Sequence, residues 1–364
     1  MLIGALLQAP THYSMSNSSS SLPPNKRRRV KKGGKNNRFS MATSVRIAVV
    51  GDVHDYWNLE EDTKALELLK PDLVLFTGDF GNEENAKLVK SIADLTIAKA
   101  AIMGNHDAWN TSKFSSRKKD DVQLQLDCLG MEHVGYRRLD FPTLKLSVVG
   151  GRPFSTGGDR LFRPKLLSKR YGIRSMEESA KRIYKSALGT PEDHSIIFLA
   201  HNGPTGLGSE VNDICGRDWT FEGGDHGDPD LADALSQLKE TAKLSVPLVV
   251  FGHMHKKLAD GNGLRKMVVV GDDNSIYLNG AIVPRVIKLV VKQNGTSENP
   301  ATKSVVGTKR AFTLVEILGG RLEKIAETWV SVMGDKVALH EEHILFSSGP
   351  SVSKPSGEDN PPRG

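Results

Sequence analysis

The chain has 364 residues, of which 38% are hydrophobic and 25% are charged, as in a soluble globular protein with one large domain or two small ones. It contains only two cysteines, Cys128 and Cys215, so no disulfide framework is indicated, and no apolar run approaches the roughly 18 residues that span a bilayer. The net charge of +6 arises from the first 51 residues, which hold nine Lys or Arg and no acid. The rest of the chain is close to neutral, which argues against a nucleic-acid-binding surface on the folded body.

The first 44 residues are rich in serine and basic residues and show little apolar periodicity. This composition is typical of an organelle transit peptide, and we expect residues 1–44 to direct import into a plastid (chloroplast) and to be removed. The basic run at 26–32 supports a second interpretation, a nuclear localisation signal. A third interpretation is a solvated, disordered tail on a nuclear or cytoplasmic protein. In each case the fold begins near residue 45.

From residue 45 onward, short β-branched runs alternate with longer amphipathic runs. Asp52, Asp79 and Asn105 follow three successive apolar runs, at intervals close to the roughly 30 residues of a βαβ unit. This rhythm is typical of a parallel sheet. The predicted strands up to residue 251 are 46–50, 73–77, 97–103, 144–149, 196–200 and 247–251, and the predicted helices are 59–70, 86–95, 122–129, 175–188 and 231–242.

The region after His255 has a different pattern, with strand-like runs separated by Gly or Pro. The runs 266–270, 275–278 and 285–291 indicate a finishing antiparallel set. Two further runs, 312–318 and 322–330, predict a β-hairpin joined through Gly319 and Gly320. We therefore divide the chain into a disordered leader (1–44), a main domain (45–292), a C-terminal extension (293–346) and a disordered tail (347–364).

Polar residues stand just beyond five of the predicted strands, where ligands bind in open α/β sheets. Residues two apart in an extended segment point the same way, so two of these places can each aim two ligands at one point. The set contains oxygen and nitrogen donors without sulfur, which suits Mn, Fe or Zn. Seven donors exceed the needs of one tetrahedral zinc ion, so two metal ions that share a carboxylate are expected. The seven residues are Asp52, His54, Asp79, Asn105, His201, His253 and His255.

The order Gly-Asp-x-His, Gly-Asp, Gly-Asn-His-Asp, His and Gly-His-x-His resembles the calcineurin-like metallophosphoesterase superfamily over roughly residues 45–292. The resemblance implies an α/β fold, a four-layer α/β/β/α sandwich with a dimetal site at the strand ends. It also implies that His106 protonates the leaving oxygen. The implied ligands are Asp52, His54 and His255 for one metal and Asn105, His201 and His253 for the other, with Asp79 bridging both.

The resemblance implies a metal-dependent phosphoric ester hydrolase in which a metal-bridging hydroxide attacks phosphorus. Its partner would be a small-molecule or phosphorylated substrate, with neither a nucleic acid nor a membrane required. Two other classes remain open at this point. One is a non-catalytic scaffold with the same fold, and the other is a nuclease or nucleic-acid-binding protein that uses the basic N-terminal arm.

The chain departs from the protein Ser/Thr phosphatases of this superfamily after Asp79, where it reads Phe80-Gly81-Asn82-Glu83 in place of an Asp-Arg-Gly element. Protein phosphatase activity is therefore disfavoured. Arg152, just past another predicted strand, could supply the missing phosphate-binding cation or could only tie down its own loop. Asn82 takes the place of a carboxylate that pairs with the catalytic histidine in those relatives. We expect its side-chain amide to hold His106 by a hydrogen bond.

Overall fold

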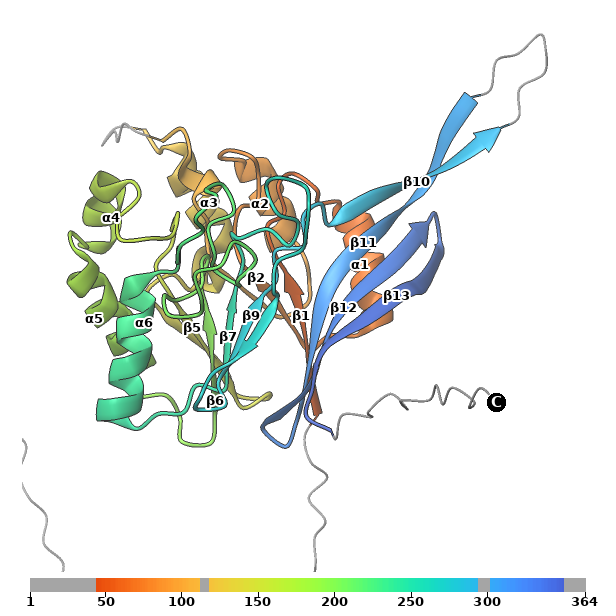
Figure 1. The fold of residues 1–364 in the computed structure, drawn as a ribbon. Helices are drawn as coiled ribbons and strands as arrows, with labels where there is room; N and C mark the ends of the chain where they lie inside the picture. Colours follow the sequence, from red (N-terminus) through yellow and green to blue (C-terminus); the bar gives the residue numbers. More distant parts are fainter. Residues whose placement is uncertain (1–43, 112–117, 294–301, 350–364) are drawn as a thin grey trace, which may run out of the picture. The chain divides into compact units, whose positions relative to one another are not determined.

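The structure is a computed structural model that describes residues 44–111, 118–293 and 302–349 (Figure 1). The predicted leader, apart from Ser44, and the predicted tail beyond residue 349 lie outside the described residues. Among the described residues, no helix has the length and apolar character needed to cross a membrane.

The first sheet combines N-terminal and C-terminal strands. Three parallel strands, β1 (Ser44–Val50), β2 (Leu73–Phe76) and β3 (Lys99–Ala101), form one side of it. β1 pairs on its other edge with β11 (Thr302–Leu318), which runs antiparallel and is followed by β12 (Arg321–Met333) and β13 (Lys336–Ser347). β10 (Val286–Gln293) also pairs with β11. The C-terminal strands thus belong to the same sheet as the first three strands (Figure 1).

The second sheet has the order β4-β5-β6-β7-β9-β8. Its four central strands are parallel, and the two edge strands, β4 and β8, run antiparallel to their neighbours. The strands are β4 (Arg138–Phe141), β5 (Leu146–Gly150), β6 (Ser195–Leu199), β7 (Leu248–Phe251), β8 (Val268–Val270) and β9 (Ile276–Asn279).

Several helices begin at residues whose side chains cap the helix. The side chains of Asn58, Asn85 and Ser175 each accept a hydrogen bond from a backbone N–H in the first turn of the following helix, which satisfies a donor that the helix itself leaves unpaired. The α-helices are α1 (Leu59–Leu69), α2 (Ala86–Ala93), α3 (Asp121–Leu129), α4 (Pro164–Tyr171), α5 (Met176–Ala187) and α6 (Pro229–Gln237). A π-helical turn, Leu238–Ala242, continues α6, and short 3-10 helices occupy His106–Ala108 and Gly130–Glu132.

The two sheets pack face to face, and the alternating directions of the side chains along β1 show which residues fill the space between them. Ile47 and Val49 lie in a buried cluster with residues of β5, β6, β7 and β9, whereas Ala48 and Val50 lie in the cluster that includes helix residues. Full burial of such a side chain contributes roughly 1.5–3 kcal/mol for Val or Ile. The predicted α/β class is confirmed, with helices and two multistranded sheets.

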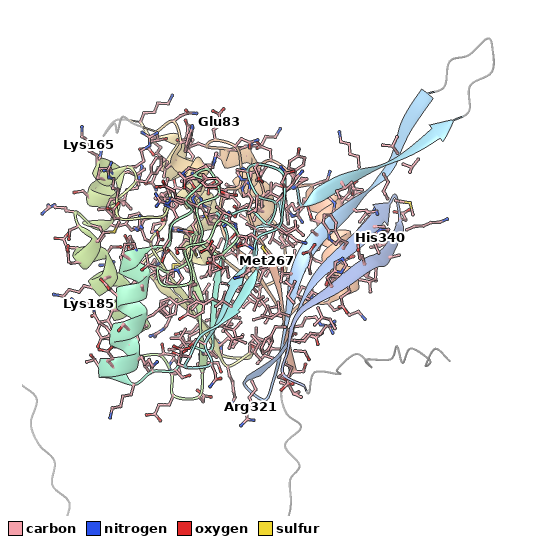
Figure 2. All side chains as sticks on the ribbon, in the orientation of Figure 1. Glu83, Lys165, Lys185, Met267, Arg321 and His340 are labelled. Atoms are coloured by element: carbon pink, nitrogen blue, oxygen red, sulfur yellow. The ribbon has the colours of Figure 1, made fainter. Side chains whose placement is uncertain are left out.

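The strand pairing differs from the predicted parallel sheet with a finishing antiparallel set. The strands that repeat the same strand-helix rhythm are divided between two sheets. β8 and β9 remain in the second sheet, with β9 parallel to β7, whereas β10 joins the first sheet beside β11. β11 and β12 pair antiparallel across Gly319 and Gly320, and a further strand, β13, follows them. Figure 2 shows His340 on this outer strand, where the side chain is exposed.

Candidate metal centre

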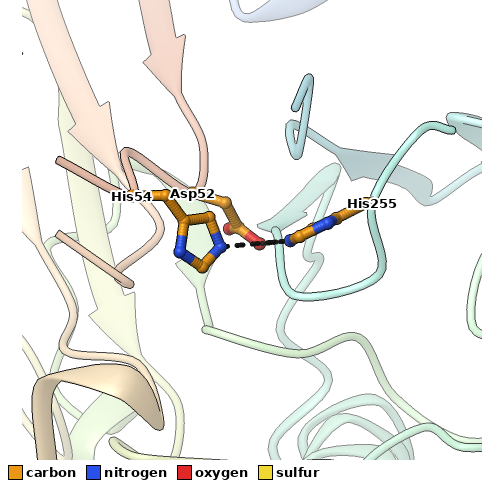
Figure 3. A group of neighbouring side chains, drawn as sticks. All are labelled: Asp52, His54 and His255. Carbon is orange, nitrogen blue, oxygen red and sulfur yellow. Dashed lines mark hydrogen bonds and ion pairs between the residues drawn. The ribbon is translucent and has the colours of Figure 1, made fainter. Parts of the chain in front are cut away.

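The predicted ligand residues meet between the ends of strands from both sheets. Asp52 and His54 follow β1, and His255 follows β7 in the opposite sheet. One ligand atom from each of these three residues lies within 4.8 Å of the others, and Figure 3 shows the side chains directed toward one another. The His54 and His255 Nε2 atoms are 3.1 Å apart, and His255 Nε2 lies 3.5 Å from Asp52 Oδ2. These three residues form the first candidate metal group.

A second candidate metal group lies beside the first and is linked to it by contacts of Asp79. Asp79, which follows β2, gathers with His201 and His253 to within the same 4.8 Å. His201 Nε2 lies 3.4 Å from Asp79 Oδ1 and 2.9 Å from Asn105 Oδ1. Asp79 also groups with His54 and His106, and its Oδ2 lies 3.9 Å from His54 Nε2. Asp79 therefore stands between the two groups, where a shared carboxylate was expected.

The backbone around these residues is tightly constrained. Asp52, Asp79 and His253 have φ values of 40°, 48° and 65°, a left-handed conformation that costs a non-glycine residue roughly 1–3 kcal/mol. A Cβ atom at Gly104 would lie 2.2 Å from Asp79 Oδ1, and one at Gly252 would lie 2.2 Å from Asp52 Oδ1. Both glycines are therefore required for the carboxylates to occupy these positions.

Outer hydrogen bonds orient the histidine rings. His201 Nδ1 lies 2.7 Å from the carbonyl oxygen of Thr77, and His253 Nε2 lies 3.2 Å from that of Thr156. When each of these nitrogens donates to its carbonyl, the other ring nitrogen keeps its lone pair for a metal ion. Asp52 Oδ1 accepts from Thr77 Oγ1 and from the His253 backbone N–H, while its Oδ2 is buried with no hydrogen-bond partner among the described residues. A buried carboxylate oxygen that accepts no hydrogen bond and lies 3.5 Å from the His255 imidazole fits a bound cation.

The electrostatics of the centre also favour positive charge. Burial opposes the charged form of His201, but the Asp79 carboxylate outweighs it and raises the pKa of His201 to about 10. Burial lowers the pKa of His253 to about 3. Burial likewise opposes ionisation of Asp79, yet the charge of His201 holds its pKa below the usual range. A proton on His201 thus supplies the charge that a metal ion would supply in its place.

His106 is held in a pocket formed by one loop and one aromatic ring. Its Nδ1 lies 2.7 Å from the backbone carbonyl oxygen of Asn82, and its ring stacks on Trp109 with centroids 4.8 Å apart and planes inclined by 7°. The His106 backbone N–H donates to Asp79 Oδ1 at 2.9 Å. A bond from Nδ1–H to the carbonyl leaves Nε2 as the ring nitrogen available for proton transfer.

The predicted contact between the Asn82 side chain and His106 is wrong. The Asn82 amide Nδ2 donates to Asp55 Oδ2 at 2.7 Å, and only the Asn82 main chain meets the imidazole. Asp55 also accepts from the Asn82 backbone N–H and from Asn85 Nδ2, so one carboxylate fixes this loop. An Asn82→Asp substitution would face Asp55 and would not bring a carboxylate to His106.

Of the two roles considered for Arg152, phosphate binding and a structural one, the structure favours the structural role. Its Nη2 lies 2.7 Å from Asp228 Oδ1 and its Nε lies 2.9 Å from Asp230 Oδ2, with side-chain exposures of 0%, 1% and 0%. Both carboxylates come from the start of α6, so the arginine ties the end of β5 to that helix. A guanidinium that is fully buried and paired with two carboxylates favours the structural role of Arg152 over phosphate binding.

A cavity of about 250 Å³ opens onto the centre. Asp79, His106, His253 and His255 line it, together with residues that the sequence did not single out: Asp218, Trp219, Met254, Lys257, Ala259 and Arg265. Trp219 belongs to the long Gly- and Asp-rich segment between β6 and α6, and loops of this length often form binding sites.

Comparison with known families gives one match. A family model described as calcineurin-like phosphoesterase matches residues 45–257. No curated protein matches the chain.

Among solved structures, a hypothetical protein from Thermus thermophilus shares 13% identity at a TM-score of 0.39, covering 79% of this chain and 99% of its own. A predicted phosphoesterase from Streptococcus pneumoniae shares 11% identity at 0.29, covering 83% and 98%. A structure of PhoD shares 9% identity at 0.42, covering 84% and 72%.

Proposed function

Since its family model matches residues 45–257, the chain belongs to the calcineurin-like phosphoesterases, and we propose that it is a metal-dependent hydrolase of a phosphate ester. The observation that carries this proposal is the convergence of oxygen and nitrogen donors from both sheets, with Asp79 between the two candidate groups. Each group includes a carboxylate and imidazoles, which are ligands for Mn, Fe or Zn.

We assign the residues to two metal ions in the way that the resemblance implies. Asp52, His54 and His255 would hold one ion, Asn105, His201 and His253 would hold the other, and Asp79 would serve both. When bound, such ions activate water and neutralise charge on the phosphate. The surrounding protein supplies fixed ring orientations, through the carbonyl oxygens of Thr77 and Thr156.

His106 is the proposed general acid. Its ring lies in the candidate group with His54 and Asp79, and the Asn82 carbonyl and the Trp109 ring fix its plane. When the ester bond breaks, Nε2–H donates its proton to the departing oxygen, which spares that oxygen from leaving as an alkoxide. The Nδ1–H bond to the Asn82 carbonyl oxygen fixes the orientation of the ring before transfer.

The test compares His106→Ala with the wild-type protein on two esters. We expect unchanged metal content by elemental analysis and a kcat lower by roughly 10²- to 10⁴-fold for an alkyl phosphate, which is the usual range for a general acid. An activated aryl phosphate, whose leaving oxygen hardly needs a proton, should lose much less. Equal losses for both esters would show that His106 binds phosphate and would refute its role as the acid.

A further inference from the structure

Trp219 is exposed although it lines the cavity at the candidate metal centre. Its side chain lines the cavity together with His106, His253 and Asp79, and 54% of its surface is exposed. An indole ring left half in water forgoes the stabilisation that burial would provide, and such rings commonly serve to bind ligands. Because Trp219 forms one wall of the cavity, a bound molecule would cover it.

The position of Trp219 is fixed relative to the candidate ligands. The neighbouring carboxylate of Asp218 pairs with Arg265 at 2.9 Å and accepts a hydrogen bond from the Ala259 backbone N–H. Arg265 is 3% exposed, and its Nε donates to the carbonyl oxygen of His255 at 3.0 Å. One buried arginine thus joins the residue next to Trp219 to the segment that carries His255.

A second contact supports the indole from behind. The Trp219 ring packs edge-on against His226, with centroids 4.8 Å apart and planes at 86°. His226 in turn lies 6.4 Å from the His253 ring and shares with it the carbonyl oxygen of Thr156 as a hydrogen-bond partner. The Trp219 indole is therefore supported on one side by residues that also fix a candidate ligand.

Lys257 places a positive charge on the same cavity. It lies two residues beyond His255, and its ammonium group has no ion pair or hydrogen bond within the part of the chain that the structure describes. Its neighbour Lys256 differs, because its Nζ pairs with Glu327 at 2.6 Å. An exposed ring and an uncompensated cation beside one hydrolytic centre suit a substrate that carries both a flat ring and a negative charge.

We propose that the leaving group of the substrate is a nucleotide, so that the substrate is a nucleoside diphosphate or a close analogue. This inference rests on the proposed function. The base stacks on Trp219, the phosphate that stays with the nucleoside pairs with Lys257, and the terminal phosphate occupies the centre. Hydrolysis forms a bond between the oxygen of water and the terminal phosphorus, breaks the bond from that phosphorus to the bridging oxygen, and leaves the bridging oxygen with the proton from His106.

Four substrates separate the ring from the charge. ADP has the ring and a second phosphate, AMP has the ring and one phosphate, pyrophosphate has two phosphates and no ring, and glycerol 3-phosphate has one phosphate and no ring. We expect ADP to give the highest kcat/KM with the full-length, metal-loaded protein. Trp219→Leu should lower kcat/KM for ADP and AMP by roughly 5- to 100-fold, in line with the loss of one base-stacking contact, and should leave pyrophosphate and glycerol 3-phosphate unchanged.

Matched variants isolate each contact. Trp219→Phe should retain most of the activity on ADP, because a phenyl ring still stacks. Lys257→Met should lower kcat/KM for ADP and pyrophosphate by about 10-fold but not for AMP. Phe221→Leu is the control, because Phe221 is fully exposed and lies two residues from Trp219 but does not line this cavity. It should behave as the wild type on all four substrates.

A binding measurement separates this inference from the proposed function. In a His106→Ala background with metal bound, ADP should quench tryptophan fluorescence, and Trp219→Leu should abolish most of the quenching while Phe221→Leu preserves it. Quenching that depends on Trp219, without hydrolysis of any ester by the wild type, would support the subsite and refute the proposed function. Hydrolysis with equal effects of Trp219→Leu on all four substrates would refute the subsite and leave the proposed function intact.

Discussion

Arg152→Met provides a direct test of the buried ion pairs between β5 and α6. The substitution preserves much of the side-chain volume but leaves Asp228 and Asp230 without their cation, at exposures of 1% and 0%. Breaking a buried pair in this way costs about 3–5 kcal/mol. For a domain of this size, 1 kcal/mol shifts Tm by roughly 2–4 °C, so we expect a decrease of about 6–20 °C in a thermal unfolding scan.

The loss of stability caused by Arg152→Met should depend on pH. Burial raises the pKa of Asp228 from 3.8 to about 7 even with Arg152 present, and removing the cation raises it further. The acid is neutral in the folded state below that range, so the destabilisation of Arg152→Met should be smallest near pH 5 and should grow toward pH 8.

The additional substitutions Asp228→Asn and Asp230→Asn should restore much of the stability, since no buried charge then lacks a partner. A normal Tm for Arg152→Met together with a raised KM would refute this reasoning and would restore Arg152 as a phosphate ligand.

Three other predictions concern metal content, His106 orientation and pH. Asp79→Asn should reduce the metal content of both sites, as measured by elemental analysis, because it removes their shared charge; retention of two ions would contradict the shared role. Asp55→Ala should lower kcat for an alkyl phosphate by about 10- to 100-fold at unchanged metal content, with no further effect in a His106→Ala background. Burial lowers the pKa of His133 from 6.5 to about 4, so this residue's stability contribution is complete above pH 6.5 and falls by up to about 3 kcal/mol toward pH 4. In chemical denaturation, the free energy of unfolding of His133→Phe should therefore decrease less between pH 6.5 and pH 4 than that of the wild type.

The candidate ligands could be located from the sequence because each stands directly beyond a strand. A short motif such as Gly51-Asp52-Val53-His54 carries its own geometry, and convergence follows once the strands lie side by side. The contact of Asn82 could not be predicted in this way. Its distance along the chain from Asp79 does not determine whether its amide or its carbonyl meets His106, and that choice depends on Asp55, in another loop.

Long-range partners account for most of the other differences. The role of Arg152 depends on Asp228 and Asp230, which lie more than 70 residues further along the chain. A strand-helix rhythm looks the same whether successive strands join one sheet or two, so the rhythm alone does not show the division between the sheets, and only the resemblance carried by the order of the motifs implied it. β13 shows no clean apolar alternation because most of its side chains on both faces are exposed, and it was missed for that reason.

The pairing of β1 with β11 has a consequence for how the protein reaches its folded state. Ser44 lies opposite Leu318, so about 270 residues must be synthesised between the two members of the pair. At a translation rate of roughly 5–20 residues per second, β11 is synthesised about 15–50 s after β1. During that interval the open edge of β1, Val45 to Val49, can pair with another nascent chain. We therefore expect folding yield to depend on holding the emerging chain apart from its copies until the C-terminal strands arrive.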